Sequence, residues 1–380
     1  MVQKDVDTII VGGGVSGLAC ARKLFDNRKD FFIITEDIGG RILTSKKGNV
    51  NYGAYYLMKD YKNIKKYVEL GRKLTPLMIH FHKKHHTYTI FNKRLFTHFS
   101  QLIRLIFLLR RFRKDYESFK IECENKSQKE ALKNNLFLLK LYKQNAEKLL
   151  QEYKIKELVE DYMSEVLHGT TFLPIKKLNG FTFLHFALPL IVPISEFKFL
   201  KDKLIKGFKR KIINDSVIRV SKAKDIYKVK TKKKTYFTKN LVIATPPHIS
   251  AKLLKLNKIK KTVKAHMFHL RGTLKKTWEE CEANLFSDNN RMFAIAHQQD
   301  NSYLFYSLGD KPNFNIYFSK YKIIKHHFWN PAFNLSGHEL WDCEIKKNLF
   351  LIGDHNICGL EDSYITGMYA ANKIISDSKN

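Results

Sequence analysis

The feature that most constrains the fold is a glycine-rich turn that directly follows a short apolar strand. Thr8-Ile9-Ile10 leads into Gly12, Gly14 and Gly17, and the small-residue stretch 18–21 follows. Gly12 permits a tight turn, Gly14 lets a pyrophosphate approach the backbone, and Gly17 lets a helix lie close to the strand. The helix N-terminus offers free N–H groups and a positive dipole end to phosphate oxygens. We therefore expect dinucleotide contacts from Gly12, Gly14, Val15, Ser16 and Gly17.

A second strand indicates which nucleotide is bound. Residues 31–35 are apolar or β-branched and end at Glu36, about 20 residues after the last glycine, where a ribose-binding acid is expected. Asp37 competes for this role, and an acid at a strand end is also often simply solvated. Either carboxylate favours a free 2′-hydroxyl over a 2′-phosphate, so the sequence disfavours NADP.

Further glycine and arginine motifs follow in order along the chain. Gly39-Gly40-Arg41 predicts a second backbone cradle with a guanidinium fork, suited to the other side of a pyrophosphate. Residues 240–247 read as a strand followed by two prolines. Residues 349–354 read as a buried strand ending in Gly353 and Asp354, and a helix is expected to begin near Gly359.

These blocks together resemble the FAD-binding segments of the flavin-containing amine oxidase superfamily, which includes protoporphyrinogen oxidases and phytoene desaturase relatives. The resemblance implies FAD as the cofactor. It implies that Val217 contacts the adenine and that Gly353 and Asp354 lie near the ribityl-pyrophosphate. It also implies that a helix N-terminus at Ile365 and Thr366 faces the flavin pyrimidine oxygen, where it would stabilise the charge of the reduced ring.

The sequence also departs from this pattern. Only Asp37 and Ile38 separate Glu36 from Gly39, a shorter loop than in the superfamily, so we expect Glu36 to be displaced from its ribose contact. Amine oxidases carry a tyrosine near the position of Gly359, as one wall of an aromatic cage, and glycine has no ring. Amine oxidation is therefore not favoured. No catalytic residue is assigned, because Lys264 matches the superfamily lysine too loosely.

The predicted fold class is α/β, with a Rossmann-like FAD-binding domain and an inserted α+β substrate domain. We assign residues 1–57, 200–250 and 335–380 to the discontinuous FAD-binding domain. Residues 58–199, largely helical in pattern with a helical period through 129–162, and residues 251–334 would form the substrate or cap domain. In the second insertion we expect strands at 264–271, 292–296, 303–308 and 314–318.

The formal net charge of +32 suits anionic partners, although A/T-biased coding would give the same lysine-rich composition. The predicted helix 101–113 has Leu102, Leu105, Ile106 and Leu109 on one face and basic residues opposite. It could pack on a neighbour or contact an anionic membrane peripherally. We do not expect nucleic acid as a partner. The five scattered cysteines, the absence of a signal peptide and the lack of a long apolar span predict a cytoplasmic protein, either free or peripheral at a membrane. The sequence leaves the oligomeric state open.

His80, His82, His85 and His86 have no cysteine or acid among them, so no metal site is predicted. No second glycine fingerprint exists, so a separate NAD(P)H domain is not expected. The predicted function is an FAD-dependent oxidoreductase that moves hydride from a C–H or C–N bond of a small or lipidic organic substrate to flavin N5. Oxygen, a quinone or another acceptor would reoxidise it. Two alternatives stay open: a flavin-binding protein without catalysis, and an enzyme whose basic surface works on a membrane or nucleic-acid partner.

Overall fold

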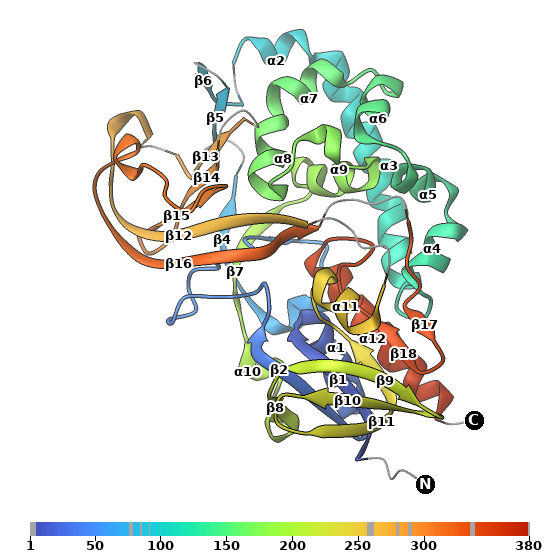
Figure 1. Cartoon of the computed structure of the whole chain (residues 1–380). Helices are drawn as coiled ribbons and strands as arrows, with labels where there is room; N and C mark the ends of the chain where they lie inside the picture. Colours follow the sequence, from blue (N-terminus) through green and yellow to red (C-terminus); the bar gives the residue numbers. More distant parts are fainter. Residues whose placement is uncertain are drawn as a thin grey trace.

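The computed structural model describes residues 5–75, 79–83, 86–90, 92–256, 262–278, 281–287, 291–334 and 339–378. Figure 1 shows a largely parallel sheet and its helices in the lower half, with a helical group and a largely antiparallel sheet above them. The chain passes between the two halves several times, so segments that are distant in sequence meet in each half.

The lower half is built on an eight-stranded sheet with the central order β17-β18-β11-β1-β2-β8, in which β1 pairs in parallel with β2 and β11. The core of this sheet contains β-branched side chains, and Ile9 and Ile10 are completely buried. The strands are β1 (Val6–Gly14), β2 (Phe31–Gly39), β8 (Ile212–Asn214), β9 (Val217–Ala223), β10 (Ile226–Thr231), β11 (Thr235–Ile243), β17 (Glu344–Lys346) and β18 (Leu349–Leu351).

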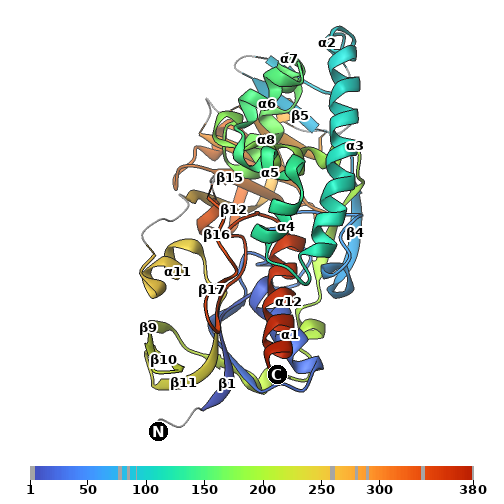
Figure 2. The same ribbon diagram turned by 90° about the vertical axis from the view of Figure 1, so that its right-hand side faces the viewer.

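Two helices from opposite ends of the chain lie side by side on this sheet (Figure 2). They are α1 (Val15–Asp26) and α12 (Leu360–Asp377). They can approach closely because residue 367 is a glycine. A Cβ at this position would lie 2.1 Å from the backbone oxygen of Ser16. The smaller helices of this half are α10 (Lys201–Leu204) and α11 (Pro247–Leu254). The expected Rossmann-like unit of β1, turn and α1 is therefore present, and α12 packs against its helix.

The upper half contains a group of helices between β4 and β7. They are α2 (Arg94–Thr97), α3 (Phe99–Glu122), α4 (Gln128–Asn134), α5 (Leu136–Lys143), α6 (Ala146–Glu152), α7 (Lys156–Tyr162), α8 (Ser164–Thr171) and α9 (Gly180–Ala187). The helical period through 129–162 is thus divided among four short helices. Asn135 and Asn145 cause two of the breaks, since their side chains accept hydrogen bonds from backbone N–H groups and begin new helices.

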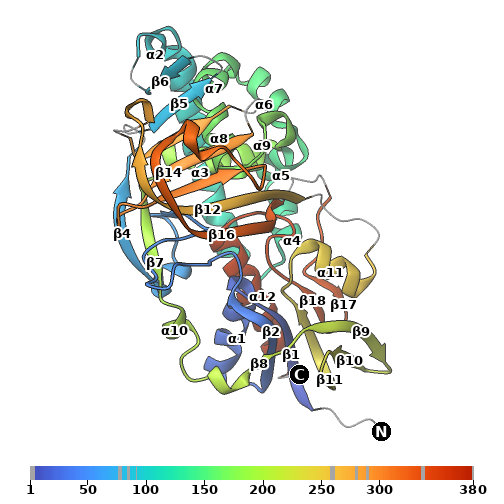
Figure 3. The same ribbon diagram turned by 60° about the vertical axis from the view of Figure 1, so that its left-hand side comes forward.

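A seven-stranded sheet, in the order β16-β12-β15-β14-β13-β5-β6, forms the rest of the upper half, and a three-stranded sheet β3-β7-β4 lies beside it (Figure 3). The strands are β3 (Leu57–Met58), β4 (Val68–Leu74), β5 (Ile79–Lys83), β6 (His86–Tyr88), β7 (Ile194–Phe199), β12 (Thr262–Leu274), β13 (Ala283–Phe286), β14 (Met292–His297), β15 (Tyr303–Ser307) and β16 (Phe318–Asn334).

The strand predicted at 314–318 is wrong. Phe314–Ile316 forms a 3-10 helix, because the side chain of Asn313 accepts a hydrogen bond from the N–H of Asn315 and turns the chain. The strand begins only at Phe318 and then continues for 17 residues. The predicted domain boundaries at 57/58 and 250/251 fall inside β3 and α11, and the division into two domains stays an interpretation.

Candidate functional site

The glycine-rich turn joins β1 to α1 at the carboxyl edge of the parallel sheet. Gly12 has φ +114°, and a Cβ there would lie 2.6 Å from the oxygen of Ala244. A Cβ on Gly17 would lie 2.1 Å from the oxygen of Gly12, so only glycine fits at either position. Gly14 differs, because no described atom lies within 4 Å of the place where its Cβ would be. The turn therefore packs tightly against neighbouring backbone at Gly12 and Gly17, whereas Gly14 faces open space.

Helix α1 begins at Val15 directly over this open space. No side chain caps its N-terminus, and its first turn carries no acidic residue. Ser16 lies in that first turn. Uncapped N–H groups and the positive end of the helix dipole make this position suitable for an anion such as a phosphate.

The second predicted phosphate-binding segment, residues 39–41, lies against the glycine-rich turn between β1 and α1. Gly39 and Gly40 both have positive φ, +117° and +56°, and a Cβ on Gly40 would lie 3.1 Å from the Cα of Gly14. Arg41 follows at once, and its side chain is about one-third exposed. The structure thus brings Gly14, Gly40 and Arg41 to one place, as the sequence predicts.

Arg41 is also paired with a buried carboxylate from the far end of the chain. Its Nη2 lies 2.5 Å from Oδ2 of Asp354, and Nδ2 of Asn334 donates to the same oxygen at 2.5 Å. Burial opposes both charges, but the attraction between the partners outweighs it. The pKa of Asp354 is therefore lowered and the pKa of Arg41 is raised. Part of the arginine's bonding capacity is thus used within the protein, on Asp354 and on the nearby Cys358 thiol.

Gly353 and Thr366 fasten α12 to this site. The N–H of Gly353 donates to Oγ1 of Thr366 at 2.9 Å, and a Cβ on Gly353 would lie 3.5 Å from Oγ of Ser16. The residues expected at the N-terminus of this helix, Ile365 and Thr366, instead lie in its second turn, because the helix already begins at Leu360. Their backbone N–H groups are thus within the helix, and the free dipole end lies several residues earlier.

The first turn of α12 carries two buried acids that sequence reasoning did not single out. Glu361 accepts hydrogen bonds from the backbone N–H groups of Lys62, Asn63 and Ile64 at 3.0, 2.7 and 3.0 Å. Asp362 accepts a hydrogen bond from the hydroxyl of Tyr116 at 2.7 Å. Burial raises the pKa of both acids. The acidic pair after Gly359 was the available signal, and it fixes α12 to residues 62–64 and to Tyr116 on α3.

The predicted ribose and adenine residues meet at the other end of the cradle. Between the pairs Val11–Ile34 and Gly13–Ile38, β2 has a bulge that turns Glu36 outward into solvent. The hydroxyl of Ser216 donates to the Glu36 carboxylate, and Val217 follows at the start of β9. The short loop therefore becomes a bulged continuation of the strand, and Glu36 lies next to the segment predicted to contact the adenine.

On the opposite side of the site, Gly53 packs between Arg41 and Trp329, which belongs to the seven-stranded sheet. A Cβ on Gly53 would lie 2.0 Å from the oxygen of Arg41 and 3.3 Å from the Trp329 ring. The indole Nε1 of Trp329 is buried and has no hydrogen-bond partner among the described residues. Lys264 is exposed on β12, in register next to Ala265, which pairs with Trp329.

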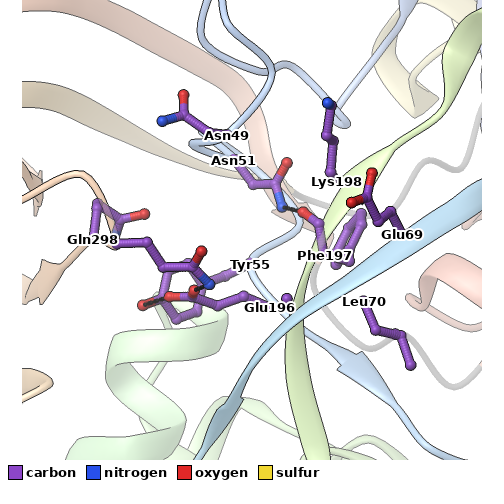
Figure 4. A pocket seen from close by; sticks show the side chains of 11 residues that line it. Asn49, Asn51, Tyr55, Glu69, Leu70, Glu196, Phe197, Lys198 and Gln298 are labelled. Atoms are coloured by element: carbon purple, nitrogen blue, oxygen red, sulfur yellow. Dashed lines mark hydrogen bonds between the residues drawn. The ribbon is translucent and has the colours of Figure 1, made fainter.

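A polar pocket of about 140 Å³ is lined by Tyr55, two residues after Gly53, and by Glu196 on β7 (Figure 4). Glu196 is buried in it and binds Arg72 at 3.0 Å, Nε2 of Gln299 at 2.5 Å and the hydroxyl of Tyr55 at 3.3 Å. The Oδ1 of Asn51, which lines the pocket, is buried without a partner among the described residues. The volume suits a group about the size of a benzene ring. Only the pairing of β4 with β7 brings Arg72 to Glu196, so sequence alone gave no signal for this pocket.

The histidines that the sequence analysis considered for a metal lie on β5 and β6. Nε2 of His82 lies 2.7 Å from Oδ1 of Asn284, and His85 falls outside the described residues. In the described part of the chain, no group of three histidine, cysteine or acidic side chains is placed to hold a metal ion. No described helix is long and apolar enough to cross a membrane.

Comparison with known proteins places this site in a recognised fold. Residues 10–69 match the family of NAD(P)-binding Rossmann-like domains. No curated protein matches the chain.

Solved structures match over the whole chain at low sequence identity. Cyclohexylamine oxidase from Brevibacterium oxydans IH-35A has 13% identity and a TM-score of 0.70, covering 99% of this chain and 100% of its own. A fatty acid isomerase from P. acnes has 12% identity and a TM-score of 0.73, covering 99% of each chain. A putative protoporphyrinogen oxidase from Exiguobacterium sp. 255-15 has 13% identity and a TM-score of 0.64, covering 100% of each chain. The chain therefore has, over its whole length, the fold of these enzymes, and the predicted α/β class is confirmed.

Proposed function

We propose that this protein is an FAD-dependent oxidoreductase that removes hydride from a C–H or C–N bond of an organic substrate, with oxygen, a quinone or another molecule as the final electron acceptor. One observation carries the proposal. Three distant segments, around Gly14, Gly40 and Gly353, meet at the carboxyl edge of a parallel sheet, where an uncapped helix N-terminus faces open space. Such an edge is the usual place for a dinucleotide.

The residues present fit FAD. The open space at Gly14 and the N–H groups at the start of α1 suit the pyrophosphate, with Arg41 at the side. We assign Glu36 to the adenosine ribose and the segment at Val217 to the adenine; in support, the hydroxyl of Ser216, next to Val217, donates to the Glu36 carboxylate. When bound, FAD supplies the two-electron acceptor for hydride removal.

The protein's own groups would set the electrostatics and the orientation of the reactants. The pair formed by Arg41 and the buried Asp354 would keep a fixed dipole at the cradle, and Asn334 holds the carboxylate in one orientation. Gly53 packs between the backbone oxygen of Arg41 and the Trp329 ring, so it fixes the distance of the Trp329 strand from the cradle.

The structure gives little support to an amine substrate held in an aromatic cage. A Cβ on Gly359 would lie 2.1 Å from Oδ2 of Asp362 and 2.9 Å from Cε1 of His185, so no larger side chain fits there. Cyclohexylamine oxidase acts on an amine and the P. acnes enzyme on a fatty acid, and we propose the second type, a lipidic or other non-amine substrate, for this chain.

The first test is the absorption spectrum of the purified protein, followed by release of the cofactor and anaerobic reduction. We expect the two visible bands of an oxidised flavin, with FAD in the supernatant. Bleaching by an organic donor would distinguish an enzyme from a flavin-binding protein without catalysis. A colourless protein that does not bind added FAD would overturn the proposal.

A matched pair of glycine variants tests the cradle itself. Gly14→Ala adds a methyl group to open space at φ −74°, so we expect a loss of stability of no more than about 1 kcal/mol from the weaker N-cap and at least about tenfold weaker FAD binding. Gly309→Ala is the control, because its Cβ would meet only the flexible end of Arg291 at 3.5 Å. FAD binding by Gly14→Ala as tight as by the control would contradict the assignment.

A further inference from the structure

The start of the cap's helical group exposes an unusual row of large apolar side chains. Phe96 on α2 and Phe99, Ile103 and Phe107 on α3 are 81%, 62%, 40% and 63% exposed. We call these four residues the α2–α3 ridge. Scattered apolar residues are normal on a protein surface, whereas a contiguous row marks an interaction site.

The ridge is a distinct face of α3 and is not its packing face. Phe99, Ile103 and Phe107 recur every fourth residue and therefore lie above one another along the helix. Leu105, Leu109 and their neighbours on the opposite face are buried in the cap. The face predicted from Leu105 and Leu109 thus packs on the protein, and a second apolar face remains outside. Figure 2 shows α3 along the outer side of the molecule, with α2 at its end.

Cations accompany the ridge. Residues 99–114 contain five arginines and lysines and no acid, and Arg104, Arg110, Arg111 and Lys114 are all exposed. Arg104 donates to the backbone oxygen of Lys154, and Arg111 lies 4.0 Å over the Phe137 ring. In the described part of the chain, no carboxylate forms an ion pair with Arg110 or Lys114. Arg113 is paired with Asp60, so Arg110 and Lys114 carry the positive charge that no described ion pair neutralises.

We propose that the α2–α3 ridge docks the protein peripherally on an anionic lipid surface. Aromatic and aliphatic side chains would enter the boundary between headgroups and acyl chains, while the flanking arginines and lysine attract anionic headgroups. A second copy of this chain is a poor occupant, because it carries the same net charge of +32 and would repel the patch. This inference does not depend on the cofactor or the reaction.

The test is cosedimentation of the full chain with vesicles made of equal parts phosphatidylcholine and phosphatidylserine, compared with phosphatidylcholine alone. We expect binding to the mixed vesicles that weakens as salt is raised. The triple variant Phe96→Ser/Phe99→Ser/Phe107→Ser should lower the partition coefficient by at least about tenfold, since each large side chain contributes on insertion. Arg110→Gln/Lys114→Gln should lower it by about tenfold or more on anionic vesicles only.

Two control variants test whether a loss of vesicle binding is specific to the ridge and to its cations. Leu308→Ser/Ile316→Ser/Ile324→Ser removes three other exposed apolar side chains, and Lys228→Gln/Lys230→Gln removes two other exposed cations. Both should bind vesicles like the wild type. The proposal is overturned if the wild type does not bind the mixed vesicles or if the ridge variant binds as the wild type does. It is also overturned if the ridge variant only abolishes self-association in light scattering.

Discussion

Asp354 is held by two residues from different parts of the chain, Arg41 after β2 and Asn334 at the end of β16. Its carboxylate is buried, so the charge is tolerated only because a cation and an amide surround it. The sequence pattern predicted that Arg41 and Asp354 would both lie at the cradle. It could not predict that they would bind each other, because no local signal connects residues so far apart.

Arg41→Met should lower the free energy of unfolding by about 2–3 kcal/mol, because it leaves the buried Asp354 charge without its partner. In the double variant Arg41→Met/Asp354→Asn that uncompensated charge is absent, so part of the loss should be recovered. Urea unfolding of the four proteins of this double-mutant cycle measures the coupling. A loss in the double variant equal to the sum of the two single losses would show that the pair contributes no net interaction.

His185 gives a prediction about pH. It is fully enclosed next to Tyr116, and burial together with nearby Lys120 lowers its pKa to about 3. The unfolded chain takes up this proton near pH 6.5, whereas the folded protein does not, so stability falls as pH decreases below about 6.5. This one group should account for about 2 kcal/mol of stability lost between pH 6.5 and pH 5.

The check is urea unfolding of the wild type and of His185→Gln at both pH values. The variant has no imidazole to protonate, so its stability should decrease less by that amount. A pH dependence identical to that of the wild type would mean that His185 is protonated in the folded state.

At the scale of elements, the parts that sequence predicts well are those with a local physical cause. Residues 6–26 form the expected strand and helix because the glycines dictate the turn, and residues 349–377 form another strand and helix. The cap was harder to predict. Asn135 and Asn145 break a continuous helical period by capping, and Asn313 turns a predicted strand into a 3-10 helix. The pocket at Glu196 depends on strand pairing between distant segments, which periodicity does not encode.

The contact between α1 and α12 gives a prediction at this scale. Gly367→Ala would place a methyl group 2.1 Å from the backbone oxygen of Ser16 and 3.0 Å from the Cβ of Ala19. Neither atom can move without separating the helices, so we expect a loss of at least about 3 kcal/mol in stability. Thermal unfolding next to Gly309→Ala is the measurement, and an unchanged midpoint would contradict the close packing.

At the scale of the whole molecule, the net charge of +32 is a source of self-repulsion in the folded state. Salt screens charges at separations beyond the Debye length, about 10 Å at 0.1 M, so it should relieve this repulsion more than it weakens the close ion pairs. We therefore expect the unfolding midpoint to rise by several degrees as sodium chloride is added to a low-salt buffer. A midpoint that falls with salt would show that attractive pairs dominate.

The packing of the first helix against the last has a consequence for synthesis of the protein. The glycine turn leaves the ribosome first, but Ser16 acquires its neighbours Gly353 and Gly367 only when nearly the whole chain has been made. The sheet partner β11 is made well before then, but α12, which packs against α1, is among the last elements to be made. The nascent chain thus stays open to aggregation and proteolysis for most of translation, and loss of the last 20 or so residues is expected to leave every earlier segment of the nucleotide site unfinished.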